Sequence, residues 1–186
     1  MKSKSTVIWL ILLAIALLTV ASFFLPYASV NKERRERIER YPDAMYAAEI
    51  NMTNSDAADL SLFEYFRLYL YSAKHLSGNY QGVSILCVVL LSLMAVNVLL
   101  ILLFVILRKA VPCIVFSILN SGVFAVFSWD MVDRGVIDGS KYSFSITFYL
   151  MILLMALIFA GAIVAIVFKK KEKKEQTIIQ TPYAWQ

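Results

Sequence analysis

The stretch VSILCVVLLSLMAVNVLLILLFVIL, residues 83–107, decides the fold class because its 25 consecutive residues include no charged side chain. As an α-helix rising about 1.5 Å per residue, it exceeds the roughly 30 Å of the hydrocarbon core of a bilayer. Three further uncharged stretches have similar lengths, at residues 6–25, 111–129 and 144–168. The four stretches predict an all-α membrane protein built as a bundle of four transmembrane helices.

The composition agrees with this class. Of the 186 residues, 60% are hydrophobic, whereas a soluble domain has about 45–50% apolar residues. Because Lys2 and Lys4 precede the first stretch, a cleaved signal peptide is the alternative to a retained span. The apolar core of a signal peptide has about 7–15 residues, so we expect the longer stretch 6–25 to stay as a membrane anchor; cleavage after it would leave three spans.

The orientation follows from where the basic residues lie. Nine of them lie in the termini and the middle turn, and nine lie in the two other loops, so their number alone does not decide. Charge controls translocation best in short loops. The turn 108–110 is short and the basic tail 169–186 directly follows a span, whereas the loop 26–82 has 57 residues. We therefore expect a multi-pass protein of the cell membrane with residues 1–5 and 169–186 in the cytoplasm, and 26–82 and 130–143 outside.

The loop 26–82 contains two predicted helices, of which the first covers about residues 32–41. Its sequence KERRERIER interleaves five basic residues with three glutamates, and Asn31 is a suitable N-cap. Glutamate and arginine four residues apart stabilise a helix, so one interpretation is a solvated helix that pairs its own charges. The other is a contact surface for anionic lipid headgroups or an acidic partner, formed by Arg34, Arg35, Arg37 and Arg40.

The second predicted helix of this loop covers about residues 61–77. Ser61 and Glu64 have the spacing of a capping box. At 100° per residue one face of this helix is apolar, and it contains Leu62, Phe66, Tyr69, Leu70 and Leu76. Two interpretations remain open: the helix lies in the membrane interface, or it packs over the outer ends of the spans as a small cap that a partner can contact.

Inside the spans the polar residues are amides and small hydroxyls. Asn97 lies eleven residues before Arg108 and Asn120 lies eleven residues after Lys109. In an antiparallel hairpin the two amides would lie at the same depth, so we predict a structural interhelical polar pair. The alternative is that each amide faces a different helix.

Small residues and cysteines complete the membrane stretches. Gly161 and Ala165 form a small-xxx-small pattern, which lets helices approach closely within the bundle or against a partner. Cys87 and Cys113 lie near opposite ends of their predicted spans, so we expect both to be reduced.

The function is predicted only as a class. The sequence contains no catalytic, cofactor-binding or metal-binding motif. We expect a non-enzymatic integral membrane protein that needs no cofactor, metal or nucleic acid. In this prediction it is an accessory or interaction subunit of a cell-envelope complex, and it contacts the lipid bilayer and another membrane or envelope protein through its outer loop. The alternative is a transport or channel module formed by oligomerisation.

Overall fold

The computed structural model describes the backbone of residues 4–180 and the side chains of residues 6–171. The chain is mostly helical, at 75%. Three helices are long and apolar enough to cross a membrane: α5 (Asn79–Ile106), α6 (Ala110–Asp133) and the part Ile146–Lys171 of α7 (Ile146–Gln180). Helix α1 (Lys4–Ser22) is also apolar, but its stretch Thr6–Ser22 is shorter.

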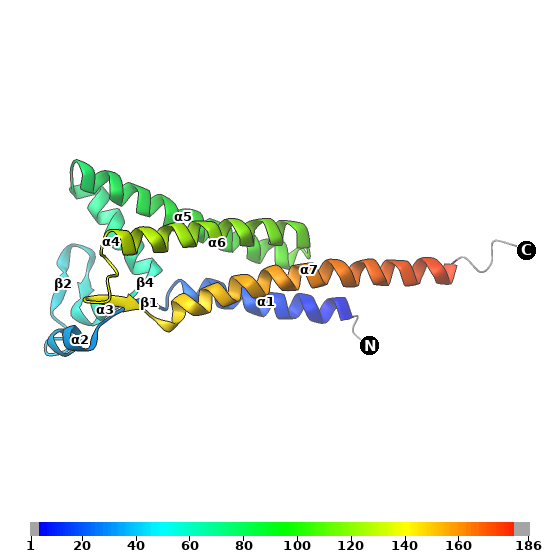
Figure 1. Cartoon of the computed structure of the whole chain (residues 1–186), viewed down its shortest axis with the longest axis horizontal. Coiled ribbons are helices and arrows are strands. Elements are labelled where there is room, and N and C mark those ends of the chain that lie inside the picture. Colours follow the sequence, from blue (N-terminus) through cyan, green and yellow to red (C-terminus); the bar gives the residue numbers. More distant parts are fainter. Residues whose placement is uncertain (1–3, 181–186) are drawn as a thin grey trace, which may run out of the picture.

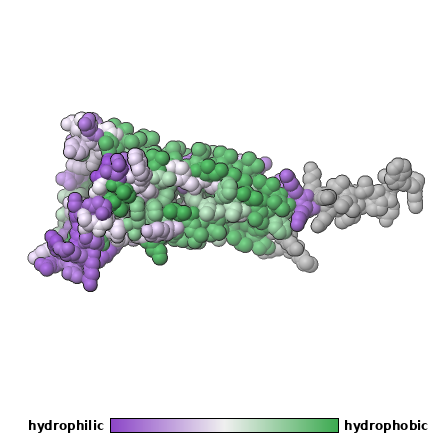
Figure 2. All heavy atoms as spheres, in the orientation of Figure 1, coloured by the Kyte–Doolittle hydropathy of each residue, from purple (hydrophilic) through white to green (hydrophobic). Residues whose placement is uncertain are grey.

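These helices run side by side along the long axis of the molecule (Figure 1). Helix α5 packs against α6, α1 packs against α7, and the contacts α1–α5 and α6–α7 join the two pairs. On the face that Figure 2 shows, apolar residues cover the middle of the helices and hydrophilic residues lie near both ends. That distribution is typical of helices that face lipid along their length and water at their ends.

The helix ends differ from the predicted boundaries. Helix α1 ends at Ser22, three residues before the predicted end, and the chain enters a strand at Pro26. A residue before proline disfavours the helical conformation, which explains an end ahead of this position. Helix α5 starts at Asn79 and α6 continues to Asp133, so both exceed the apolar stretches from which they were predicted.

The segments at one end of the helices form what we call the head, residues 26–78 together with 134–145 (Figure 1). Its main sheet has three antiparallel strands in the order β4–β1–β5. A second sheet pairs β2 with β3. The bounds are β1 Pro26–Val30, β2 Met45–Ala47, β3 Met52–Thr53, β4 Asp59–Ser61 and β5 Tyr142–Phe144, with the 3₁₀-helix η1 at Ala48–Ile50 and α3 at Asn54–Ala58.

The strands correct the predicted all-α fold class, because the loop 26–82 was expected to contain two helices and also contains strands. Strand β1 pairs with β4 far along the same loop and with β5, which lies beyond α5 and α6. Because these three strands have only three to five residues, none is long enough to show the two-residue alternation by which a strand is recognised. Tertiary contacts therefore decide these strands.

The buried side chains form two clusters. One joins the head to the adjacent ends of α5, α6 and α7, and the other lies between α1, α5, α6 and α7 farther from the head. In the second cluster a Cβ added at Gly161 would lie 2.6 Å from Cδ2 of Leu12, so α1 and α7 approach closely there. Gly161 is thus in contact within the chain, one of the two uses predicted for its small-residue pattern.

We expect Gly161→Ala to lower the free energy of unfolding by about 1 kcal/mol. Overpacking costs about 1–3 kcal/mol, and the better helix propensity of alanine returns up to about 1 kcal/mol. Leu12 is buried and has little room to move. Gly122→Ala is the matched control, because no atom lies within 4 Å of its Cβ position. Thermal unfolding in detergent compares the two variants; equal stability of both would contradict the close approach.

Candidate interaction surface

The basic run lies on helix α2 (Lys32–Ile38), which ends three residues earlier than predicted. The side chain of Asn31 accepts a hydrogen bond from the backbone N–H of Arg34, which confirms the predicted N-cap. The guanidinium of Arg37 lies 2.5 Å from Glu33, and that of Arg35 lies 3.3 Å from Glu39. The helix therefore pairs part of its charge internally.

Two of the four arginines predicted to contact headgroups or a partner are bound within the head. Arg35 also lies 2.5 Å from Asp59, and the hydrogen bond from its guanidinium lowers the pKa of the Asp59 carboxyl. Arg34 lies over the ring of Tyr142, 5.4 Å from the ring centre. Arg37 and Arg40 are exposed. Contact of the four arginines with lipid or a partner stays a prediction. Of the four, the exposed Arg37 and Arg40 are best placed for such a contact.

Helix α4 (Leu62–His75) carries the predicted capping box. The hydroxyl of Ser61 accepts from the N–H of Glu64, and the carboxylate of Glu64 accepts from the N–H of Ser61. The helix packs along α5. On its apolar face Leu62 is buried, and three further predicted residues are half-buried: Phe66, Tyr69 and Leu70.

Two residues in and next to α4 correct the predicted apolar face. Leu76 is 47% exposed, because the helix ends before it and its backbone is extended. Tyr65 was not predicted to face the core, yet it is buried, and its hydroxyl has no hydrogen-bond partner among the described residues. Burial raises the pKa of Tyr65. A tyrosine next to Phe66 falls near the edge of the apolar stripe, where the helical period alone does not decide burial.

The ring of Tyr27 on β1 holds the head to the helices. Its side chain is fully buried, and its hydroxyl donates a hydrogen bond of 2.9 Å to Ser128 on α6. Five aromatic rings have their centres 5.5–6.0 Å from that of Tyr27: Tyr65, Phe124, Phe127, Phe144 and Phe148. Because these rings come from α4, α6, β5 and α7, one side chain connects four elements.

A polar cluster lies where α4 crosses the ends of α5 and α6, and the sequence did not predict it. The guanidinium of Arg134 forms an ion pair with Asp130, and it donates to the Tyr69 hydroxyl at 3.4 Å and the Cys87 sulfur at 3.1 Å. The Tyr69 hydroxyl in turn faces the sulfur of Met131 at 3.5 Å. Burial raises the pKa of Tyr69 to about 12, so its hydroxyl is protonated at neutral pH.

This cluster lies partly in residues 130–143, which were predicted as an outer loop after the third span. Helix α6 continues one turn beyond the predicted end, which places Asp130 on the helix and makes Arg134 its C-cap. A cation at this position is favourable because the carbonyl end of a helix carries partial negative charge. In the sequence, the spacing of four between Asp130 and Arg134 was the available signal for this ion pair. The pair is half-buried because α4 packs over it.

Two neighbouring cavities form what we call the lateral groove, which lies between α1, α4 and α5. The first has a volume of about 170 Å³ and the second about 340 Å³, and Phe23, Phe63 and Ala95 line both. Phe63 belongs to the head, and the ring centres of Phe63 and Phe24 lie 5.4 Å apart at the rim. On the helix side, the small residues Ser92 and Ala95 line the second cavity. The groove is apolar and extends from the head onto the faces of the helices.

The two predicted partners Asn97 and Asn120 are both buried, at 3% and 0% exposure, on the packed helices α5 and α6. The amide nitrogen of Asn120 lies 3.4 Å from the sulfur of Met155 on α7. The nitrogen of Asn97 and the side-chain oxygen of Asn120 have no hydrogen-bond partner among the described residues. One amide therefore has a free donor and the other a free acceptor, and the direct bond between them stays a prediction.

We expect Asn97→Leu to lower the free energy of unfolding by about 0.6–2 kcal/mol, the range measured for interhelical polar bonds in membranes. If the amides act as a pair, Asn120→Leu and the double variant should cost no more than the single variant. Thermal unfolding of the three proteins in one detergent measures this coupling. An unchanged or higher stability of Asn97→Leu would mean that the unpaired amide only costs free energy in the core.

Cys87 and Cys113 are free and buried, in agreement with the prediction of two reduced cysteines. Among the described residues, no three histidine, cysteine, aspartate or glutamate side chains are grouped so that they could hold a metal ion. No protein-family model, curated protein or solved structure matches the chain. The physical features of the surface therefore carry the functional conclusion.

Proposed function

We propose that the chain is an integral membrane protein with four spans, both termini in the cytoplasm and the head as a cap outside. In this proposal it is a non-enzymatic accessory subunit that binds a membrane-spanning helix of another cell-envelope protein. The lateral groove is the observation that carries the proposal. Its walls come from the outer segment and from two helices, so a partner that fills it contacts the head and lies within the bilayer at the same time.

The shape of the groove favours a helix as its occupant. Ser92 and Ala95 lie about one turn apart on α5, and small residues allow the backbone of a second helix to approach. The hydroxyl of Ser92 donates to the carbonyl oxygen of Val88 on its own helix, so it needs no polar partner. The exposed rings of Phe24 and Phe63 at the rim give an incoming helix a large apolar contact.

Site-specific photocrosslinking in intact membranes tests the proposal. A photoreactive phenylalanine analogue in place of Phe63 should give one discrete protein adduct. The same analogue in place of Ile118, an exposed residue of α6 that lines neither groove cavity, should give none. Equal adducts at both positions, or the complete absence of a protein adduct at position 63, would contradict a helix-binding groove.

A groove-filling substitution separates binding from stability. Ala95→Leu should remove the adduct, because the added side chain enters the volume that the partner helix needs. Ala125→Leu is the matched control on the exposed face of α6, and it should leave the adduct unchanged. Both variants should unfold within a few degrees of the wild type in detergent. An adduct that survives Ala95→Leu would place the partner elsewhere.

The proposed topology has its own test. Single cysteines at Arg40, His75 and Glu175 are treated with a membrane-impermeant maleimide on sealed cells, in a background without Cys87 and Cys113. The first two positions should react on intact cells, whereas position 175 should react only after permeabilisation. Labelling of position 175 on intact cells would reverse the orientation and with it the assignment of the head to the outside.

A transport or channel module formed by oligomers is the second candidate. It requires water to reach polar groups inside the membrane, and Asn97 and Asn120 are the buried amides of α5 and α6. Both are almost fully buried within one copy, so an oligomer would have to open a path to them. We favour the interaction subunit because the groove is already accessible in a single chain.

A further inference from the structure

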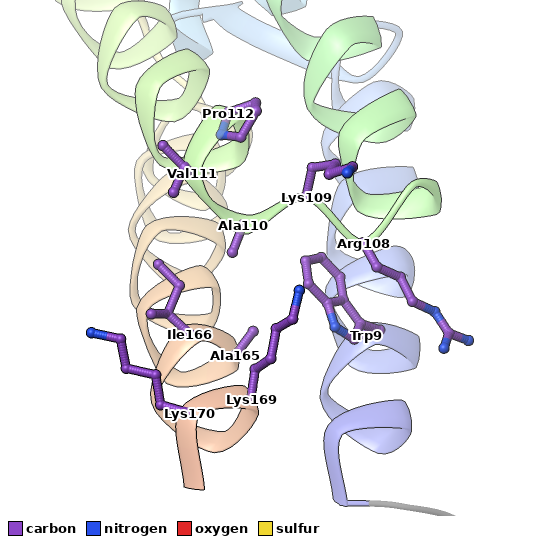
Figure 3. A pocket seen from close by; sticks show the side chains of 10 residues that line it. All are labelled: Trp9, Arg108, Lys109, Ala110, Val111, Pro112, Ala165, Ile166, Lys169 and Lys170. Atoms are coloured by element: carbon purple, nitrogen blue, oxygen red, sulfur yellow. The ribbon is translucent and has the colours of Figure 1, made fainter. Parts of the chain in front are cut away.

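A cavity lies at the end of the helices opposite the head, where α1, α7 and the turn between α5 and α6 meet. We call it the basal cavity. Its volume is about 350 Å³. Four of the residues that line it are cations: Arg108, Lys109, Lys169 and Lys170. The other lining residues are apolar, with the indole ring of Trp9 among them, and Figure 3 shows the Lys169 side chain running from α7 toward the turn beside that ring.

The described charged residues that line the basal cavity are all cations. None of the four cations belongs to an ion pair within the part of the chain whose side chains are described, and no acidic residue lines the cavity. Glu172 and Glu175 lie outside that part. At physiological salt, charges within about 8 Å still interact, so four cations around a space of this size repel one another. An anion in the cavity would relieve that repulsion.

The backbone adds to the preference for an anion. Helix α6 starts at Ala110, and its N-cap Lys109 provides no side-chain cap. The first N–H groups of a helix have no partner within it, and they carry partial positive charge. Pro112 in the same turn has no N–H, whereas Ala110 and Val111 each have one, and both residues line the cavity.

Arg108 has a left-handed backbone conformation that favours glycine. Its φ is +53°, in the left-handed region, directly after the C-cap Leu107 of α5. Glycine is the usual residue at this position after a helix, and a side chain there costs about 1 kcal/mol. The chain therefore keeps an arginine where the turn alone would favour glycine, and this arginine is one of the residues that line the cavity.

We propose that the basal cavity binds an anionic phospholipid, with the headgroup phosphate among the four cations and the acyl chains along the apolar lining. The inference rests on the proposed membrane-spanning arrangement, which places this end of the helices at the lipid headgroups. A ligand with both an anionic head and an apolar tail matches the two kinds of lining residue. With the proposed orientation the cavity faces the cytoplasmic leaflet, where anionic lipids give the surface a negative potential.

The binding test uses the full chain purified in a mild detergent and freed of native lipid. Phosphatidylglycerol should raise the unfolding temperature by several degrees, and phosphatidylcholine with the same acyl chains should not. Inorganic phosphate at the same concentration should have no effect. Equal stabilisation by both lipids would contradict recognition of charge, and full stabilisation by phosphate alone would identify a soluble anion as the ligand.

Substitutions assign the effect to the cavity. One basic residue near an anionic headgroup contributes about a fivefold change in affinity, so Arg108→Gln with Lys169→Gln should weaken phosphatidylglycerol binding more than tenfold. Lys74→Gln with Lys141→Gln removes the same charge from exposed positions of the head and should leave binding unchanged. Arg108→Gly is informative because it relieves the strained turn. It should keep or raise the stability without lipid while it lowers the lipid-dependent shift.

A second readout does not depend on unfolding. With Trp129→Phe and Trp185→Phe, Trp9 is the only tryptophan in the chain. Phosphatidylglycerol with brominated acyl chains should quench its fluorescence at lower concentration than brominated phosphatidylcholine does. Equal quenching by the two lipids would overturn the proposal. Neither assay requires a protein partner, so loss of the Phe63 adduct with retained lipid selectivity would contradict only the proposed helix-binding function.

Discussion

Replacing Tyr27 with alanine is expected to lower the free energy of unfolding by about 3–5 kcal/mol, the usual cost of deleting a large buried aromatic side chain. Tyr27 is fully buried and has five aromatic rings around it. Its hydroxyl also donates to Ser128. The loss should exceed that of other single substitutions because the ring connects the head with α6 and α7. Thermal unfolding in detergent measures it, and limited proteolysis should cut the head of the variant faster.

Two further variants separate the ring from the hydroxyl and the core from the surface. Tyr27→Phe keeps the ring and removes one hydrogen bond, which contributes about 1 kcal/mol. Tyr41→Ala removes the same side chain from a position in the head that is 71% exposed, and it should change stability by less than about 0.5 kcal/mol. If Tyr27→Ala behaves like Tyr41→Ala, the head is not held to the helices through this ring.

Replacing Arg134 with leucine is expected to cost about 2 kcal/mol and to expose Cys87. Removing one partner of a fully buried ion pair costs about 3–5 kcal/mol. We expect less here because the side chains of Arg134 and Asp130 retain 24% and 19% of their exposure. The substitution also removes the donor to Tyr69 and Cys87. The cluster joins α4 to α5 and α6, so its loss should loosen α4 first.

The labelling rate of Cys87 measures this opening, in a Cys113→Ser background so that only one thiol reacts. Arg134→Lys keeps the charge but lacks the planar fork that reaches several acceptors, so it should give an intermediate result. Arg37→Leu breaks an exposed pair of the same spacing and should cost about 0.5 kcal/mol or less. If Arg134→Leu neither lowers the unfolding temperature nor speeds the labelling of Cys87, the cluster does not hold α4.

Local features of the chain were predictable because neighbouring residues determine them. The N-cap at Asn31 and the capping box of Ser61 with Glu64 occur at the expected positions, since each joins residues three apart. The three helices that are long enough to cross a membrane follow the uncharged stretches. The internal charge pairs of α2 were also predictable, because each joins residues four apart.

The candidate sites were less predictable because they combine residues from distant parts of the chain. The lateral groove needs α1, α4 and α5, and the basal cavity needs α1, α7 and the turn of α5 and α6. Within its own segment, no lining residue has a feature that marks it as part of a cavity. Of the four arginines predicted to contact lipid or a partner, Arg34 and Arg35 are held by residues more than 20 positions away, Tyr142 and Asp59.

The sequence by itself determined where the long apolar helices lie and how several shorter ones start, because periodicity, caps and uncharged length act over one or a few turns. Only the tertiary structure decided which polar side chains are buried and which segments pair as strands. Asp130 and Arg134 look like part of a hydrated loop until α4 covers them. Strand β1 exists because β4 and β5 supply its hydrogen bonds, and no property of residues 26–30 alone encodes those partners.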